Sequence, residues 1–294
     1  MTTWTQLTPS RLHQCGKLQA YGMTNVGRVR KSNEDNFLID ETLGLCIVGD
    51  GMGGHEAGEI ASAEALEALR FFIRHRLQTG AGAAPPDEDD TVPAIQPGLP
   101  IKRPTVQDDP DATLSDGSMP AVATVFDAVE YANAHLYKQN QSQSMEEGRG
   151  MGTTLTGWWQ FLPGAPVVVF HVGDSRLYLL RDGQLQQLTK DQTLYQQALD
   201  MGQTNHMPAR NLLLQAVGPS DYVNPEVFPY NMQSGDLYLL CSDGLHSGVP
   251  DNVIQDALRK THADNLPQIC EMLIDLANQY GGKDNVTVVL ARHP

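Results

Sequence analysis

The stretch "IVGDGMGGHEAGEIA", residues 47–61, decides how the rest of the chain is interpreted. An apolar run ends here in a glycine-rich loop, and a helix-like sequence follows. Gly49, Gly51 and Gly54 have the spacing G-x-G-x-x-G, which is typical of loops that hold the phosphates of a dinucleotide. The alternative is that Asp50, at the end of the apolar run, is the functional residue of the loop.

The sequence after this loop argues against a dinucleotide site. Such a site requires a second strand with an acidic residue about 20 positions further on. Residues 69–78, "LRFFIRHRLQ", continue the helical pattern instead. The charge of Asp50 would repel a pyrophosphate, and no G-K-[ST] follows to make a P-loop. A dinucleotide-binding oxidoreductase is therefore a disfavoured alternative.

The acidic composition excludes several classes of partner. The 294 residues carry a formal net charge of −15, from 35 acidic and 20 basic side chains. Such a chain repels nucleic acid and anionic lipid, so we expect neither nucleic acid nor a membrane as a partner. The N-terminus lacks the apolar segment of a signal peptide, and no apolar run is long enough to span a bilayer. Four cysteines without C-x-x-C spacing favour reduced thiols and a cytoplasmic location.

The pattern of apolar residues predicts short strands in clusters and helices in pairs. Strands are expected at 16–24, 35–40, 44–49, 153–161, 166–172, 175–188, 236–242 and 285–291, and helices at 54–78, around 122–136 and around 266–276. Asp182–Gly183 marks a hairpin turn. Strands joined by tight turns favour an α+β fold of antiparallel sheets with segregated helices over a doubly wound parallel sheet.

Residues 81–120 differ from the sequence on either side. They contain 8 of the 18 prolines, and eight acidic residues against only Lys102 and Arg103. Few large apolar side chains and no periodicity occur there, which is typical of a solvated linker. Binding of Ca²⁺ or of a basic partner is the alternative for such an acidic run. We expect one domain, 1–294, that carries this proline-rich segment as an insertion.

Aspartate recurs at the ends of the predicted strands. Asp50 lies in "IVGDG", Asp174 in "FHVGDSR" and Asp243 in "LLCSDGL", while Asp284 in "GGKDNVTVV" comes just before a strand. One such aspartate is usually a turn residue or a helix cap. Four that converge on one rim would repel one another unless cations lay among them. Carboxylates without histidine or cysteine at these positions suit hard ions, so we expect Mg²⁺ or Mn²⁺ rather than structural zinc.

A second acidic motif, "RVRKSNEDNFLID", adds Glu34 and Asp35 just before a strand. Arg30 lies four residues before Glu34. An arginine beside a carboxylate cluster can form a plain ion pair, or it can hold a phosphate with two hydrogen bonds.

Six motifs in order give the chain a family resemblance. It resembles the type 2C metal-dependent serine/threonine protein phosphatases in their bacterial form. The resemblance runs from about residue 18 to residue 292, outside the segment 81–120. The matching motifs are "RVRKSNEDNF" (28–37), "GDGMGGHEAGEIAS" (49–62), "GMGTTLTG" (150–157), "VGDSRLYLLRDGQLQQLTKDQ" (172–192), "LCSDGL" (240–245) and "KDNVTVVL" (283–290).

The resemblance implies an α-β-β-α fold, in which two antiparallel sheets form a sandwich flanked by helices and metals lie in a cleft at one end. It also implies hydrolysis of phosphoserine and phosphothreonine in proteins, with two Mn²⁺ or Mg²⁺ ions that activate a bridging water. A substrate supplied by a Ser/Thr kinase follows from that chemistry, and we expect a monomer. A catalytically inactive, phosphatase-like binding module is the alternative.

By this resemblance the metal ligands are assigned residue by residue. Asp50 would bridge two metals, and the carbonyl of Gly51 would ligate the second. Asp243 and Asp284 complete the first site, and Glu34 completes the second. The remaining implied roles are Asp35 as the residue that orients bound water, Asp174 with Asp243 as ligands of a third metal, and Arg30 as the phosphate-binding residue.

The proton donor to the leaving group is left open by the resemblance. His55 is a candidate, although it can equally be a residue of the helix start, and His206 or a metal-bound water are alternatives. The Asp-His-Ser that bacterial relatives have in common is Asp191-Gln192-Thr193 here, so contacts between this segment and a substrate are open. Thr153 and Thr154 are expected to be structural.

Overall fold

The strands of the protein form two antiparallel sheets that pack face to face. The computed structural model describes residues 6–53, 57–79, 115–142 and 150–294. The first sheet has the order β1 (His13–Cys15), β2 (Leu18–Asn25), β12 (Val286–Arg292), β11 (Leu237–Cys241), β8 (Arg176–Arg181), β9 (Gln184–Gln187). The second has the order β10 (Glu226–Tyr230), β7 (Val167–Val172), β6 (Leu155–Trp159), β4 (Leu45–Met52), β3 (Asp35–Asp40), with β5 (Gly152–Thr153) paired to β4.

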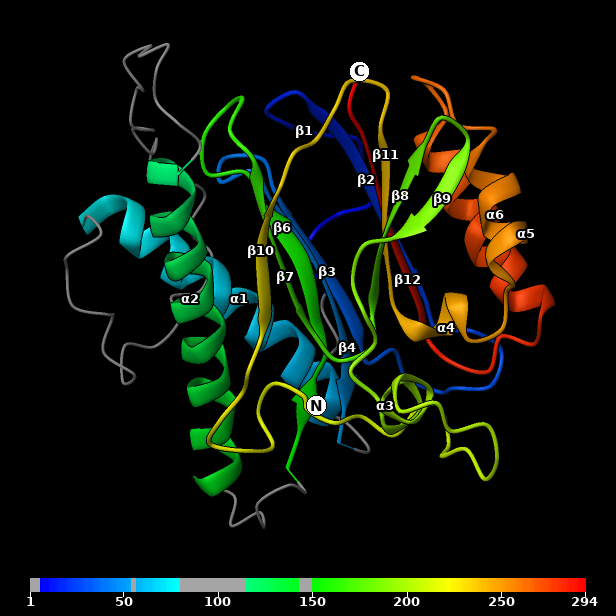
Figure 1. Ribbon diagram of the computed structural model, residues 1–294, viewed down its shortest axis with the longest axis horizontal. Helices are drawn as coiled ribbons and strands as arrows, with labels where there is room; N and C mark the ends of the chain where they lie inside the picture. The colour runs from blue at the N-terminus through cyan, green and yellow to red at the C-terminus, as the bar shows by residue number, and fades with distance from the viewer. Residues whose placement is uncertain (1–5, 54–56, 80–114, 143–149) are drawn as a thin grey trace.

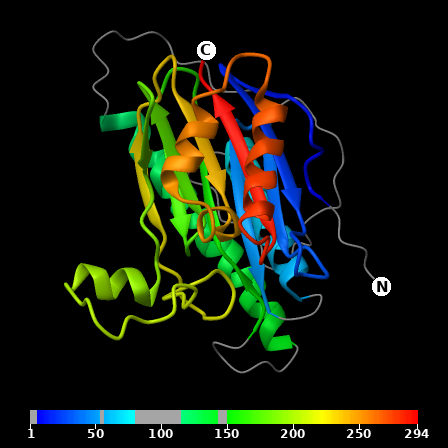
Figure 2. The same cartoon turned by 90° about the vertical axis from the view of Figure 1, so that its right-hand side faces the viewer.

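Helices cover the outer face of each sheet, so that the molecule has four layers (Figure 1). One pair lies on the second sheet and consists of α1 (Ala57–Thr79) and α2 (Ser115–Ser142). The other pair lies on the first sheet and consists of α5 (Asp251–Leu258) and α6 (Leu266–Gln279), as Figure 2 shows from that side. The short helices α3 (Leu194–Asp200) and α4 (Asp243–His246) lie at one end of the sandwich. The predicted α+β sandwich is confirmed.

Apolar side chains fill all three spaces between these layers. Phe37, Trp158 and Tyr238 are fully buried between the two sheets. Strands such as β4 and β7 are buried on both faces, which explains why they read as continuous apolar runs rather than as alternating patterns. The ends of these strands are therefore the places where polar residues of the sandwich can gather.

The pairing of β4 rules out a dinucleotide-binding fold. β4 is antiparallel to both β3 and β6, and the next element after α1 among the described residues is another helix. A dinucleotide-binding fold needs parallel strands joined through helices. The glycine-rich loop that begins at Gly49 is therefore not a dinucleotide-binding loop.

The predicted elements differ from the structure mainly at their boundaries. The helix predicted at 54–78 is α1, and residues 54–56 lie outside the described residues. α2 begins at Ser115, inside the segment 81–120, whereas residues 80–114 are outside the described residues. The predicted strand 153–161 is split into β5 and β6 at Thr154. The hairpin is confirmed, because Asp182 (φ 51°) and Gly183 (φ 72°) connect β8 to β9.

No helix within the described ranges is both long and apolar enough to cross a lipid bilayer.

Candidate metal centre

The carboxylates predicted at strand ends come from both sheets and gather at one end of the sandwich. Asp50 is in β4, directly opposite Asp35 in β3. Asp174 follows β7, Asp243 follows β11 and begins α4, and Asp284 precedes β12. This is the end where α3 and α4 lie (Figure 1).

Burial and mutual repulsion raise the pKa values of these carboxyl groups. Burial raises the pKa of Asp50 well above its usual range, and the charges of Asp35, Asp243 and Asp174 add to the effect. Burial, with a smaller contribution from Asp243, raises the pKa of Asp35 and of Asp174 to about 7 in each case. Burial also raises the pKa of Asp243 to about 6, and the charge of Asp284 adds to the effect. Each shift reports the free energy needed to keep these carboxylates ionised together without cations.

Two oxygens of the cluster are buried without a hydrogen-bond partner. The Ser242 hydroxyl donates to Oδ2 of Asp35 over 2.7 Å, but Oδ1 of Asp35 has no partner among the described residues. Oδ1 of Asp243 is likewise buried and has no hydrogen-bond partner among the described residues. Buried acceptors are normally satisfied, so these atoms have capacity for another ligand. Hard divalent cations bind oxygens of this kind, and the residues present fit them.

The cluster is not a closed coordination shell. Within the described ranges, no three histidine, cysteine, aspartate or glutamate side chains are close enough together to hold a metal ion by themselves. The carboxylates instead lie within electrostatic range of one another, as their pKa shifts show. Ions bound among them would draw ligands from several side chains and complete their shells with water, which is usual for Mg²⁺.

Gly51 lies where no side chain can be accommodated. A Cβ atom at this position would come within 2.0 Å of the carbonyl oxygen of Gly58 and 2.5 Å of that of Glu34. The N–H of Gly51 donates to the latter oxygen over 3.2 Å. The glycine thus lets the end of β4 approach the start of α1 and the Glu34 backbone closely.

Arg30 and Glu34 lie at the rim of the cluster. Nη2 of Arg30 donates to Oδ2 of Asp284 over 2.7 Å, and both side chains are partly exposed. Burial raises the pKa of Glu34, and the Arg30 charge opposes that shift. Asn285 secures the Glu34 backbone, because its Oδ1 accepts the Glu34 N–H over 2.9 Å. The guanidinium is therefore beside the carboxylates, at the solvent side of the site.

The hydroxyl groups of Thr153 and Thr154 hold Asp50 in place. Oγ1 of Thr154 accepts the N–H of Asp50 over 2.9 Å and also bonds Oγ of Ser175 over 2.7 Å. Oγ1 of Thr153 and the N–H of Thr154 both donate to the Asp50 carbonyl, over 3.0 and 2.9 Å. The motifs "GMGTT" and "LCSDGL" contain Thr153, Thr154 and Ser242, but neither motif indicates that these hydroxyls bond the Asp50 backbone or the Asp35 carboxylate.

A cavity of about 340 Å³ adjoins the carboxylates on the side of α3. Asp174 and Asp243 line it on one side, and Tyr195 and Leu199 of α3 line the other. We call residues 191–220, which include α3, the flap. Arg176 of β8 holds the start of the flap with two hydrogen bonds to Asp191, of 2.8 and 2.7 Å.

The departure Asp191-Gln192-Thr193 is accommodated by hydrogen bonds to the backbone. Oε1 of Gln192 accepts the N–H of Gly173 over 2.8 Å. Oγ1 of Thr193 accepts the N–H of Gln196 over 3.1 Å and caps α3. These residues fix the flap next to Asp174.

The structure describes only one of the two histidines that are candidate proton donors. His55 lies outside the described residues. His206 is exposed, has a left-handed backbone conformation with φ 53°, and is not among the residues that line the cavity. The geometry therefore gives His206 no support as a proton donor.

Known proteins resemble this chain over most of its length. The family model for protein phosphatase 2C matches residues 28–290. The serine/threonine protein phosphatase PstP of Mycobacterium tuberculosis is 35% identical over 273 residues, which are 90% of this chain and 43% of that protein. The serine/threonine phosphatase stp of Listeria monocytogenes is 33% identical over 276 residues, which are 91% of this chain and 92% of that protein. The chain thus spans less than half of the Mycobacterium relative and nearly all of the Listeria one.

A solved structure extends the similarity to the fold. The catalytic domain of PstP in complex with two manganese ions has a TM-score of 0.68 and 34% identity, covering 94% of this chain and 97% of that one. The similarity to bacterial phosphatases thus extends from sequence motifs to the two-sheet sandwich. The chain belongs to the protein phosphatase 2C family.

Proposed function

We propose that this protein hydrolyses phosphoserine and phosphothreonine in proteins and depends on Mn²⁺ or Mg²⁺. One observation carries the proposal: five aspartates from both sheets gather at one end, and burial and repulsion raise the pKa values of four of them. A protein that bound no cation would have no physical reason to keep this arrangement, because it destabilises the fold.

In this proposal two ions are held by Asp50, the carbonyl of Gly51, Glu34, Asp243 and Asp284. A third ion can be held by Asp174 and Asp243. Asp35 orients solvent at the site. When bound, two such ions lower the pKa of a water molecule and offset the charge of a phosphoryl group. The residues of the chain provide the frame, because β3, β4, β11 and β12 present these side chains from rigid strand ends.

Arg30 binds the phosphoryl group in this proposal. Among the described residues, its guanidinium donates one hydrogen bond, to Asp284, and it is about half exposed, so its other N–H groups can reach a substrate oxygen. We propose His55 as the proton donor to the leaving serine or threonine oxygen, since it lies five residues after Asp50 in the chain. A His55→Ala variant should then lose the basic limb of its pH–rate profile.

The substrate class implies a Ser/Thr kinase that supplies the phosphoproteins. We further propose that the protein acts as a monomer in the cytoplasm, where its four buried, unpaired thiols would stay reduced. Light scattering of the purified protein tests the monomer. A catalytically inactive binding module is not favoured by any contact of the described residues.

The test is hydrolysis of a phosphothreonine peptide by the purified protein. We expect phosphate release with Mn²⁺, loss of it with EDTA, and recovery when Mn²⁺ is restored. Asp50→Asn should abolish release, whereas Asp275→Asn, the same change on the exposed face of α6, should not alter it. Release in EDTA, or no release with any divalent ion, would overturn the proposal.

A further inference from the structure

A buried asparagine on α2 binds two loops at the same time. Asn140 is 3% exposed. Its Nδ2 donates to the carbonyl oxygens of Met151 and Gly218, each over 2.9 Å, and its Oδ1 accepts the N–H of Met151 over 2.9 Å. One side-chain amide therefore satisfies three backbone groups from segments that are 67 residues apart in the chain.

A second buried asparagine on the same helix holds only one of these loops. Asn133, two turns earlier, is 2% exposed. Its Oδ1 accepts the N–H of Gly218 over 2.8 Å, and its Nδ2 donates to the Ser220 carbonyl over 3.0 Å. Gly218 and Ser220 form the end of the flap, so Asn133 secures the flap alone. The two residues thus offer a matched pair for experiment.

Three glycines let these loops approach the helix closely. A Cβ atom at Gly150 would lie 2.2 Å from Cγ of Asn140, and one at Gly218 would lie 2.9 Å from the Met151 carbonyl oxygen. A Cβ atom at Gly152 would lie 2.7 Å from the Pro219 ring. Gly218 also has φ 110°, which other residues rarely adopt. The two loops and α2 are therefore fitted to one another at backbone distance.

The Met151 loop continues directly into the support of Asp50. Met151 precedes β5, which pairs with the end of β4 so that Thr153 lies opposite Gly51. Thr153 exchanges two backbone hydrogen bonds with Val217, of 3.0 and 2.9 Å, which ties β5 to the end of the flap. Thr153 and Thr154 then bind the backbone of Asp50. Hydrogen bonds and short backbone links thus connect Asn140 to the candidate metal ligand.

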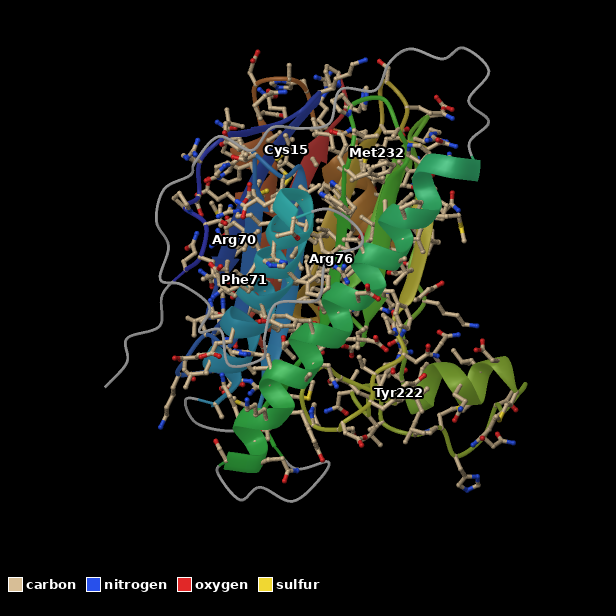
Figure 3. All side chains as sticks on the ribbon, turned by 90° about the vertical axis from the view of Figure 1, so that its left-hand side faces the viewer. Cys15, Arg70, Phe71, Arg76, Tyr222 and Met232 are labelled. Atoms are coloured by element: carbon tan, nitrogen blue, oxygen red, sulfur yellow. The ribbon has the colours of Figure 1, made fainter. Side chains whose placement is uncertain are left out.

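We propose that Asn140 is a positioning residue that sets the metal ligands of β4 and the end of the flap from one point on α2. The inference rests on the proposed function, because it takes Asp50 and Gly51 as metal ligands. Asn133 contacts only the flap, and it reaches Thr153 and the ligands only through Gly218 and Val217. In Figure 3, α2 lies beside α1 and runs toward the same end of the molecule as Tyr222, which follows the flap in the chain. The helix layer thereby couples the ion site to the wall of the substrate cavity.

The expected effect of Asn140 on metal binding follows from the length of the path. Partners that orient a metal ligand commonly change metal affinity by about 10- to 100-fold when they are removed. Asn140 acts through β5 rather than on Asp50 directly, so we expect the lower end, about 10-fold. The flap contact should appear separately, as a higher KM for a phosphopeptide.

The experiment measures Mn²⁺ binding to the full chain by the electron paramagnetic resonance signal of free Mn²⁺, together with kcat and KM. Asn140→Ala should weaken Mn²⁺ binding about 10-fold and raise KM. Asn133→Ala should raise KM and weaken Mn²⁺ binding less than Asn140→Ala does, because Asn133 has no direct bond to the Met151 loop. Val125→Ala removes a fully buried apolar group from the same helix and controls for loss of stability, so it should change neither constant.

Each result either supports or overturns the role of Asn140 as a positioning residue. Mn²⁺ affinity of Asn140→Ala within twofold of wild type, or an equal loss in Val125→Ala, would overturn the role of Asn140. If Asn140→Ala does not fold, Asn140→Asp, which has the same size but lacks the amide donors, is measured in its place and judged by the same criterion. A wild-type protein that binds no Mn²⁺ would overturn the proposed function as well, whereas an unchanged Asn140 variant of a protein that binds Mn²⁺ overturns this inference alone.

Discussion

Two aspartates at opposite ends of β11, one fully buried and one partly buried, have opposite pKa shifts. Asp236 precedes the strand and is 1% exposed, and Asp243 follows it in the carboxylate cluster. Burial acts to raise the pKa of Asp236, but hydrogen bonds from Arg181, Tyr238 and the Gln233 N–H hold it below the usual value. Burial and the charge of Asp284 instead raise the pKa of Asp243.

The opposite pKa shifts distinguish a carboxylate that the fold itself neutralises from one that has capacity for a ligand. Asp236 has a cation and several donors within the fold, so its charge is neutralised where it lies. Asp243 has an oxygen without a partner and like charges around it. Burial alone therefore does not identify a functional carboxylate. What identifies it is burial without compensation by the protein's own groups.

The largest effect should come from Asp243→Asn. We expect Mn²⁺-dependent hydrolysis to fall by more than about 100-fold, beyond the range found for residues that only orient a ligand. In EDTA the same variant should be at least as stable as wild type, because a neutral amide removes repulsion. Urea unfolding and initial rates measure both. A variant that loses stability in EDTA but keeps its rate would reverse the comparison.

The opposite result is expected for Asp236→Asn. The amide cannot accept the two charged hydrogen bonds from Arg181, so the free energy of unfolding should fall by about 2 to 3 kcal/mol. Hydrolysis by the folded protein should stay close to wild type, since Asp236 lies at the far end of β11 from the cluster. Urea unfolding with EDTA, followed by rate measurements below the transition, tests this. A large fall in kcat of the folded variant would show that the two ends are coupled.

The pH dependence should separate the two residues in the metal-free protein. The pKa of Asp243 is raised in the fold to about 6, above its unfolded value of about 3.9. Its stabilising contribution is therefore complete below pH 3.9 and is lost as pH rises through 6. The stability advantage of Asp243→Asn over wild type should grow between pH 4 and 7 in EDTA. Asp236 has a lowered pKa, so its contribution is present above about pH 3.9 and is lost as pH falls further. Unfolding curves measured at each pH test this. A stability advantage of Asp243→Asn that stays constant between pH 4 and 7 would contradict it.

The smallest effect on stability is expected at Arg30. Its single bond to Asp284 is partly exposed, so Arg30→Ala should change the free energy of unfolding by less than about 1 kcal/mol. The proposed phosphate contact should instead appear as a higher KM for a phosphopeptide. Arg181→Ala is the control, because it breaks the bidentate pair with Asp236 and should affect stability but not KM. An Arg30 variant that loses stability with unchanged KM would make Arg30 a structural ion pair.

Most of the sandwich could be predicted from the sequence, because strands buried on both faces produce apolar runs with polar ends. The strands around Asp50, Asp174 and Asp243 were located in this way. β10 was missed, since it is a half-exposed edge strand that contains Pro229 and has no clear alternation. α3 was missed because only Ala198 of its seven residues is buried, so no apolar face marks it.

The candidate site was predictable in its charged residues but not in their supports. A carboxylate at a strand end is a conspicuous pattern, and the motif "GMGTT" drew attention to Thr153 and Thr154. Asn140 has no such pattern, because a single asparagine on a helix is indistinguishable in sequence from a solvent-exposed one. Only the packed structure shows that its amide is buried against Met151 and Gly218.

Apolar periodicity and residue chemistry are local properties of the chain, so the layers of this protein and the acidic residues at its strand ends could be predicted without a structure. Which of these carboxylates the protein neutralises with its own groups depends on contacts that form only on folding. Asp236 and Asp243 are the same residue type at the ends of one strand. Their difference depends on Arg181 and Asp284, which are distant in sequence and meet them only in the folded sandwich.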